Sequence, residues 1–158
     1  MDSVVDVSDF AVSNDPDTVL VTYSLGSCIG LAIWDPVAKV GGLLHYMLPD
    51  SAIAPDKAQN NPAMFADTGI PVLFKEAYKL GGNKRRIVVK VAGGSQLMDS
   101  QGTFNIGKRN HLALRKILWH NNVMIDKEDV GGFEGRTMRL YVGTGKVTIR
   151  SKNREYEL

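Results

Sequence analysis

Runs of apolar and β-branched residues predict several strands near the start of the chain. The run VLVTYSL at 19–25 is followed by IGLAIW at 29–34, and Gly-Ser-Cys separates the two. Asp35-Pro36 then favours a turn, because proline presets the backbone for the second turn position. Another apolar run, VGGLLHYML, follows at 40–48. The last two runs are therefore expected to form a β-hairpin.

Apolar residues at helical spacing predict two helices farther along the chain. The first is expected at about 64–80. Pro71 is unfavourable in an unbroken helix, so this helix is expected to start later than residue 64 or to kink. The second helix is expected at 106–122, with Asn105 as its N-cap. The polar, turn-rich segment 50–62 before the first helix is predicted to be a loop.

Further strands complete the predicted elements. They are expected at 86–92, at 123–126, and in a final hairpin of 137–142 with 147–150 that turns at 143–145. Strands and helices thus follow one another without a repeat, a low-complexity tract or a linker. The sequence predicts a single mixed α/β domain of the α+β type over residues 1–158.

Composition and charge narrow the class of protein. A chain of 158 residues with 44% apolar and 23% charged residues has the values of a soluble globular domain. The net charge of +2 is too small to indicate a nucleic-acid partner. No apolar run approaches the roughly 18 residues of a membrane span, and MDSVVDVSDF lacks the features of a signal peptide. We expect a cytoplasmic protein without direct membrane insertion.

The only cysteine of the chain, Cys28, lies between Gly26 and Gly30 in the stretch LGSCIG. A hairpin turn near 35–39 would place residues opposite each other when their numbers sum to about 73–75, so Cys28 would face His45 or a neighbour. An imidazolium beside a thiol lowers the thiol pKa and can protonate a leaving group. The alternative is that Cys28 is a small buried hydrophobe and His45 a hydrogen-bonded core histidine.

A third group usually orients the base of such a pair. Thr22 is a candidate because it lies six residues before Cys28, and it shares a strand face with Cys28 only if the backbone stays extended through Gly26. Rival hydroxyls belong to Ser24, Ser27 and Tyr46. Backbone N–H groups near Ser27 and Cys28 are candidates for stabilising an oxyanion, and Gly26 and Gly30 would let the chain bend and let a substrate approach the backbone closely.

Several other patterns are interpreted as structural. His111 and His120 are too far apart for a two-ligand metal site on a helix, so they are expected to be exposed to solvent or to cap the helix. The acidic residues within 126–129 lack the spacing of a calcium loop and are expected to form a solvated loop. The segment GTGK at 143–146 lacks the spacing of a phosphate-binding loop, and the basic cluster KRR at 84–86 is expected on a solvated face. We predict no metal, no cofactor and no nucleic-acid binding.

Eight short motifs run through the chain in order. They are LGSCI (25–29), DP (35–36), GG (41–42), HYMLP (45–49), ADT (66–68), AGGS (92–95), NIGKRN (105–110) and DVGG (129–132). This ordered set spans most of the chain and resembles the CheD family of chemoreceptor glutamine deamidases. Two positions depart from the expected pattern, namely Ser95 in place of alanine and Tyr23-Ser24 before LGSC.

The resemblance implies an activity. The implied enzyme is a protein-glutamine glutaminase, a cysteine amidohydrolase that converts glutamines of methyl-accepting chemotaxis receptors to glutamate and releases ammonia. Cys28 would be the nucleophile that forms a thioester, His45 the general acid and base, and Thr22 the residue that orients His45. The same site would also hydrolyse receptor glutamyl methyl esters, because attack and collapse are alike.

The resemblance also implies a fold and partners. The fold would be similar to the catalytic domain of cytotoxic necrotizing factors, with mixed β-sheets packed together and helices outside. The partners would be the cytoplasmic domains of chemotaxis receptors, as substrate, and a CheC-type phosphatase that the protein stimulates; we expect a monomer. The alternative function is a docking module and activator of that phosphatase without strong catalysis, for which Ile53 and Phe65 would supply an apolar surface.

Overall fold

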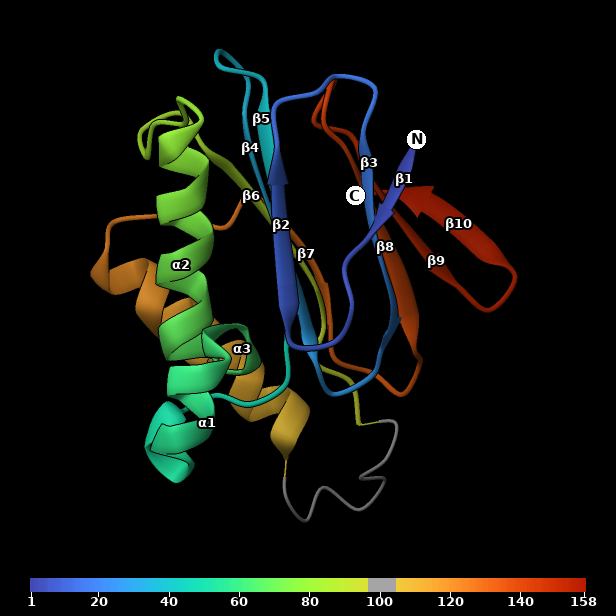
Figure 1. Cartoon of the computed structure of the whole chain (residues 1–158). Coiled ribbons are helices and arrows are strands. Elements are labelled where there is room, and N and C mark those ends of the chain that lie inside the picture. The colour runs from blue at the N-terminus through green and yellow to red at the C-terminus, as the bar shows by residue number, and fades with distance from the viewer. Residues whose placement is uncertain (97–104) are drawn as a thin grey trace.

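The computed structural model of the chain describes residues 1–96 and 105–158. Two five-stranded sheets lie face to face, and the long helices cover the outer face of one of them (Figure 1). Each sheet is mixed, because β1 pairs with β3 and β6 with β7 in parallel while the other pairs are antiparallel. The predicted α+β arrangement of packed mixed sheets with outer helices is therefore confirmed. Similarity to the cytotoxic necrotizing factor domain stays a prediction.

The elements fall into two sheets and a helical layer. The first sheet has the order β1 (Asp2–Val4), β3 (Val19–Leu25), β8 (Arg136–Tyr141), β9 (Val147–Ser151) and β10 (Arg154–Glu157). The second sheet has the order β2 (Asp9–Ser13), β5 (Val40–Tyr46), β4 (Ile29–Asp35), β6 (Val88–Gly93) and β7 (Lys127–Val130). The helices are α1 (Pro55–Asn60), α2 (Ala66–Lys79) and α3 (Ile106–His120), with short 3-10 turns η1 (Ser51–Ile53) and η2 (Pro62–Met64).

The predicted hairpin forms the centre of the second sheet as β4 and β5. Its register pairs Gly30 with His45, so the numbers of opposite residues sum to 75, within the range that the sequence predicts. Both faces of this sheet are buried, which explains the nearly continuous apolar runs. Leu31 and Leu44 face the helices, whereas Ala32 and Leu43 face the first sheet.

Helix α2 packs an apolar stripe against the second sheet, as its helical spacing predicts. Its start at Ala66 is later than residue 64, since the 3-10 turn η2 comes first. Pro71 lies within α2 on the exposed side, where water can solvate the carbonyl that lacks its helical partner. Helix α3 packs beside α2, and its Leu114 and Leu118 enter the same core.

Several predicted element bounds are wrong. The segment 50–62 is not a plain loop, because it contains α1 and the turn η1. The strand expected at 123–126 lies instead at Lys127–Val130, where Glu128 and Asp129 belong to β7 rather than to a solvated loop. Asn105 does stand at the N-cap of α3, but its φ of 50° is left-handed and its side chain makes no capping hydrogen bond.

Three strands near the ends of the chain are not predicted by the pattern of apolar residues. They are β1, β2 and β10, which are short and have few fully buried side chains. Each adds to an edge of a sheet, where pairing with a longer strand holds it and no alternation of apolar residues is required. The strand β2 matters for the site, because it pairs with β5 along the stretch that carries His45.

Candidate active site

Cys28 lies in the turn that carries the chain from the first sheet to the second. The strand β3 ends at Leu25 and β4 begins at Ile29, and these two strands belong to different sheets. A bulge between Thr22 and Leu25, with Ser24 at a left-handed φ of 58°, prepares this crossing. The half-buried Cys28 side chain packs against the edge of the core between the sheets.

His45 and Thr22 face each other across the space between the two sheets. The Nδ1 atom of His45 lies 2.7 Å from Oγ1 of Thr22, and both side chains are fully buried. The Thr22 hydroxyl also donates a hydrogen bond of 2.7 Å to the carbonyl oxygen of Val5. A carbonyl can only accept, so the single hydroxyl proton goes to Val5 and Nδ1–H of His45 is the donor to Thr22. This arrangement fixes the tautomer and leaves a lone pair on Nε2.

The side chains of His45 and Cys28 lie on the same face of the second sheet. Gly30 is directly opposite His45, and Cys28 precedes Gly30 by two residues, so the thiol is a diagonal neighbour of the imidazole. Such diagonal neighbours have backbones roughly 7–8 Å apart, within reach of long side chains. Among the described residues, the buried Nε2 of His45 has no hydrogen-bond partner. A buried imidazole with one oriented and one unpaired nitrogen is suited to accept a proton.

Burial keeps both members of the pair neutral at neutral pH. It lowers the pKa of His45 to about 4, against a smaller opposing effect of Asp6. Burial also raises the pKa of the Cys28 thiol, and the Cys28 backbone N–H only partly offsets this. The sequence-based expectation that an imidazolium ionises the thiol is therefore wrong for the free protein. The resting pair is a thiol beside a neutral base.

The loop after β6 holds the Cys28 turn through its backbone. The N–H of Gly94 donates to the carbonyl oxygen of Cys28 at 2.8 Å, and the N–H of Ser95 donates to that of Gly26 at 2.9 Å. Gly93 has a φ of +108°, and a Cβ atom there would lie 2.2 Å from the Cys28 carbonyl oxygen. The AGGS motif therefore lets one backbone approach another closely and fixes the turn.

Asn110 of α3 is a buried polar residue beside the Cys28 turn that the sequence analysis does not single out. Its Nδ2 donates to the carbonyl oxygens of Ser27, at 2.9 Å, and Met47, at 2.8 Å. The hydroxyl of Tyr46 donates to the main-chain oxygen of Asn110 at 2.6 Å. A signal was available, because Asn110 precedes the inward-facing Leu114 by one helical turn and is thus a polar residue in an apolar stripe.

The structure distinguishes among the other predicted site residues. Of the candidate hydroxyls, that of Thr22 contacts His45, whereas Tyr46 binds Asn110 on the opposite face of β5. The N–H of Gly26 donates to Ser24 at 3.0 Å and so is not available to an oxyanion. Neither Ser27 nor Cys28 donates its N–H to a backbone carbonyl in the described part of the chain.

Three sequence-based assignments need correction. Gly30 does not bend the chain or admit substrate, because it lies within β4 and the side chains of Leu25 and Met138 fill the space beside it. Phe65 is fully buried and cannot form a docking surface, although Ile53 is 62% exposed. His111 is not simply solvated, since its Nε2 lies 2.7 Å from the Glu128 carboxylate.

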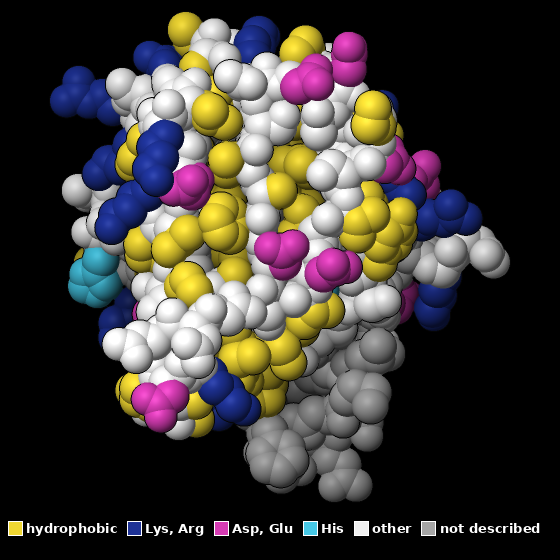
Figure 2. All heavy atoms as spheres, viewed as in Figure 1, with side chains coloured by type: hydrophobic (Ala, Val, Ile, Leu, Met, Phe, Trp, Pro, Cys, Tyr) yellow, Lys and Arg dark blue, Asp and Glu magenta, His cyan; other side chains and the backbone are white. Residues whose placement is uncertain are grey.

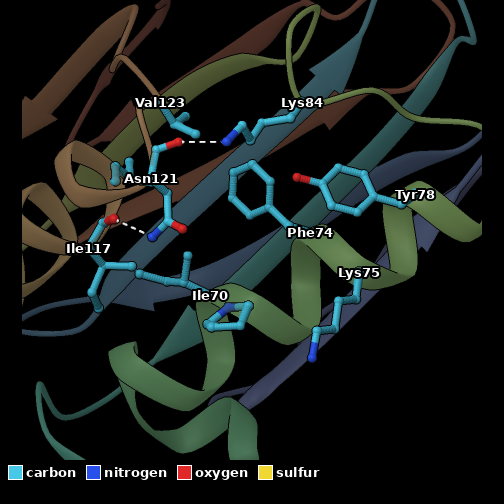
Figure 3. Close-up of a pocket in the computed structure, with 10 residues that line it drawn as sticks. Ile70, Phe74, Lys75, Tyr78, Lys84, Ile117, Asn121 and Val123 are labelled. Carbon is cyan, nitrogen blue, oxygen red and sulfur yellow. Dashed lines mark hydrogen bonds between the residues drawn. The ribbon is translucent and has the colours of Figure 1, made fainter.

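The described residues contain no group of three metal-ligating side chains that converge on a point. None of the helices among them is long and apolar enough to cross a membrane. A hollow of about 180 Å³ lies between α2 and α3, on the helical side of the second sheet (Figure 3). At its rim, the Lys84 ammonium donates to the main-chain oxygen of Asn121 at 2.8 Å, and the Asn121 side chain donates to Ile117. The hollow includes neither Cys28 nor His45.

Comparison with known proteins gives a consistent result. The family model described as CheD chemotactic sensory transduction matches residues 47–151. A relative from Syntrophus aciditrophicus, named as a probable chemoreceptor glutamine deamidase CheD 1, is 55% identical over 95% of this chain and 94% of its own. Relatives from Solibacter usitatus and Anaeromyxobacter dehalogenans carry corresponding names. They are 51% and 50% identical, over 98% and 93% of this chain and 92% of each relative.

A solved structure offers a more distant likeness. The crystal structure of a Neisseria meningitidis protein of the DUF152 family aligns with a TM-score of 0.47 and 9% identity. The alignment covers 82% of this chain and 62% of that chain. This distance is too great to inform the site. The matches to sequence relatives, which reach the segments on both sides of the Cys28 turn, are the informative ones.

Proposed function

The chain belongs to the CheD family, and we propose that it deamidates glutamine side chains of chemoreceptors through Cys28. The observation that carries the proposal is the hydrogen-bond chain from His45 through Thr22 to Val5, because it fixes the imidazole tautomer and leaves Nε2 as a base. Nε2, which has no hydrogen-bond partner in the described ranges 1–96 and 105–158, lies on the sheet face that Cys28 also occupies.

The first half-reaction forms a thioester. Nε2 of His45 takes the thiol proton while the Cys28 sulfur attacks the carboxamide carbon of a receptor glutamine, whose carbonyl oxygen becomes an oxyanion. The N–H groups of Ser27 and Cys28 are the proposed donors to this oxyanion, and Gly26 contributes only room for the substrate. The intermediate then collapses, the carbon–nitrogen bond breaks, and the proton on His45 Nε2 completes the departing ammonia.

The second half-reaction releases glutamate. His45, neutral again, takes a proton from a water molecule that attacks the thioester carbon. The carbon–sulfur bond breaks, and the proton returns from His45 to the Cys28 sulfur, which restores the starting thiol. A glutamyl methyl ester would follow the same path with methanol as the leaving group, so we include ester hydrolysis in the proposal.

Deamidation is tested by peptide mass spectrometry of receptor cytoplasmic fragments incubated with the purified protein. Wild type is expected to convert specific glutamines to glutamates, and Cys28→Ala is expected to leave them unchanged. Absence of conversion by wild type, or full conversion by Cys28→Ala, removes the proposal. Thr148→Ala supplies a control, because its buried hydroxyl lies on β9, outside the contacts of the Cys28 turn.

The proposal includes the setting of the reaction. The substrates are the cytoplasmic domains of receptors, so the protein is proposed to act in the cytoplasm. It is proposed to act as a monomer, and a site formed by Cys28, His45 and Thr22 of one chain requires no second copy. A CheC-type phosphatase is the further proposed partner. A purely docking function would predict that Cys28→Ala still stimulates that phosphatase while wild type leaves receptors unmodified, and the same two proteins decide between the functions.

A further inference from the structure

The outer face of α3 carries large apolar side chains in contact with solvent. Leu112 is 52% exposed and Trp119 is 75% exposed, and Met124, just beyond the helix, is 82% exposed. Leu112 and Trp119 are seven residues apart, which is two helical turns, so both lie on one stripe of the helix. Exposed apolar side chains that gather in one place on a soluble protein mark interaction sites more often than isolated ones do.

The same face is strongly cationic. Between Ile106 and His120, α3 has four Lys and Arg residues and no acidic residue. All four are exposed, and none forms an ion pair with a described residue; they are Lys108, Arg109, Arg115 and Lys116. Figure 2 shows several Lys and Arg side chains along the edge of the molecule on the side where the helices lie. The four α3 side chains, exposed and without an ion pair to a described residue, present positive charge to a partner.

The apolar and basic residues surround one shallow hollow. It has a volume of about 550 Å³, and its lining includes Leu112, Arg115, Lys116, Trp119 and Met124. Its one acidic lining residue, Glu128, has a carboxylate oxygen 2.7 Å from Nε2 of His111. Tryptophan and arginine are the side chains that most often dominate binding energy at protein interfaces. A hollow between them accepts protruding side chains, which a flat lipid surface does not present.

We propose that this face of α3 docks an acidic segment of the substrate protein that also carries apolar side chains. The inference rests on the proposed function, because the docked partner is the protein whose glutamines Cys28 would deamidate. Charge complementarity then favours a partner of negative charge on α3. The inner face of the same helix holds the Cys28 turn through Asn110, and a helix of 15 residues is about 22 Å long, so one protein substrate can span both places.

Steady-state kinetics with receptor cytoplasmic fragments tests the docking face. Trp119→Ala and the pair Arg115→Glu with Lys116→Glu are expected to raise KM roughly tenfold to a hundredfold, since hot-spot side chains have effects of this size. The value of kcat should stay unchanged, and so should hydrolysis of a short glutamine peptide that cannot reach α3. Lys57→Glu, which reverses an exposed charge on α1, is the matched control and should leave KM unchanged.

Each other outcome overturns the docking proposal. An unchanged KM for the α3 variants would do so directly. A second such outcome is that wild type binds phosphatidylglycerol vesicles and Trp119→Ala does not, while the KM for receptor fragments is the same in both. A third is that wild type sediments as a dimer and Trp119→Ala sediments as a monomer. Titration of receptor fragments with the Cys28→Ala protein separates docking from catalysis. Salt-sensitive binding that the α3 variants weaken keeps the docking proposal even if wild type proves inactive.

A separate observation concerns Asn110, which we infer to be a positioning residue for the Cys28 turn. Beyond the pair Ile29–Tyr46, the β4–β5 ladder stops, so Cys28 and Met47 do not pair. Instead, Nδ2 of Asn110 binds the oxygens of Ser27 and Met47 and joins the two chain ends. Asn110 thereby sets the spacing between the residue before Cys28 and the strand that carries His45.

The cost of this arrangement supports a functional reason for it. Asn110 is fully buried, yet its Oδ1 has no hydrogen-bond partner among the described residues. An apolar side chain at this inward position of α3 would remove the unpaired Oδ1, but it would leave the oxygens of Ser27 and Met47 without this donor. The need for two donated hydrogen bonds at the open end of the hairpin explains the asparagine.

The test separates positioning from folding. Asn110→Ala and the similarly shaped Asn110→Asp, which has no N–H donor when ionised, should lower kcat about tenfold or more per folded molecule with little change in KM. They should also shift the pH profile of Cys28 alkylation, which needs no receptor and so survives failure of the proposed function. Asn121→Ala, which removes an asparagine bond at the other end of α3, is the control. Lower stability with normal kcat and an unshifted alkylation profile would overturn the inference.

Discussion

The β4–β5 hairpin has a closed end, where the turn joins the two strands, and an open end beyond the pair Ile29–Tyr46. Among the described residues, buried ionisable side chains are fully paired at the closed end and only partly paired at the open end. At the closed end, Asp35 is 1% exposed, and its carboxylate accepts from the N–H groups of Val37 and Asn83, both at 2.8 Å. The Arg86 guanidinium donates to both oxygens at 2.9 to 3.1 Å. Burial would raise the pKa of Asp35, yet Arg86 and the backbone N–H groups hold it well below its ordinary value.

The open end leaves its groups unpaired. Nε2 of His45 has no partner among the described residues, and burial moves the pKa of His45 down and that of Cys28 up, toward the neutral forms. A saturated carboxylate contributes to stability and has no remaining lone pair for chemistry. A neutral imidazole with an unpaired nitrogen stabilises the fold less and can accept a proton. The hairpin therefore stabilises the fold at its closed end, and its open end is the place where we propose that the reaction occurs.

The largest effect is expected when the thiol at the open end is removed. Cys28→Ala is expected to lower kcat for deamidation by at least about 10⁴-fold, since loss of a nucleophile has effects of this order. The free energy of unfolding should change little, because Cys28 is half buried and accepts no bond from another side chain among the described residues. Receptor-fragment deamidation and urea unfolding measure the two quantities. A large loss of stability in Cys28→Ala with retained activity would show that the open end serves stability rather than the reaction.

The pH dependence of stability is the next largest effect expected at the open end. His45 has its folded pKa lowered to about 4 from 6.5, so the unfolded chain binds the proton more tightly. Stability should therefore be full above about pH 6.5 and fall by about 3 kcal/mol as the pH drops to 4. His45→Gln should lack this dependence in urea titrations at successive pH values. An equal slope in both proteins would show that His45 is not buried in its neutral form.

At the closed end, Asp35→Asn should cost stability and spare activity. Losing the charged hydrogen bonds from Arg86 is expected to lower the free energy of unfolding by roughly 1–3 kcal/mol at pH 7. The pKa of Asp35 is depressed in the folded state, so its contribution is present above the unfolded value and lost as pH falls below about 4. Wild type and variant should thus converge in acid. A kcat that falls in Asp35→Asn while stability is kept would contradict the contrast.

The smallest expected effect concerns the orientation of His45. Thr22→Val keeps the side-chain shape but removes the acceptor for Nδ1–H, and kcat should fall about tenfold, consistent with a single hydrogen bond. Thr22→Ser should restore most of the rate, because it returns the hydroxyl. Single-turnover deamidation by the three proteins measures the effect. Equal rates for valine and threonine at position 22 would remove the orienting role.

The hairpin was predictable because it is local. The turn residues after Trp34 and the two apolar runs beside them set the register, and counting across the turn brings Cys28 and His45 onto one face. Thr22 could be chosen only through the family resemblance. Its place on the other sheet depends on the bulge at Ser24, which spacing along an extended strand does not reveal.

Tertiary contacts account for what sequence reasoning missed. Asn110 reaches Ser27 across 83 positions of the sequence, and no local pattern encodes that distance. The charge states of Cys28 and His45 depend on their burial between two sheets, which the sequence does not reveal. Sequence reasoning treated the pair as exposed and so predicted an ionised thiol, whereas burial favours the neutral thiol. Edge strands such as β10 form because a longer neighbour pairs with them, although their own sequences are mostly polar.

The most direct test of the account is to trap the covalent intermediate. Wild-type protein is mixed with a glutamine-containing receptor fragment, quenched in acid within one turnover, digested and analysed by mass spectrometry. We predict an adduct on the Cys28 peptide whose mass equals that of the substrate less ammonia, and hydroxylamine should remove it. Deamidation that proceeds at full rate without any such adduct, or an adduct on a residue other than Cys28, would contradict the central claim.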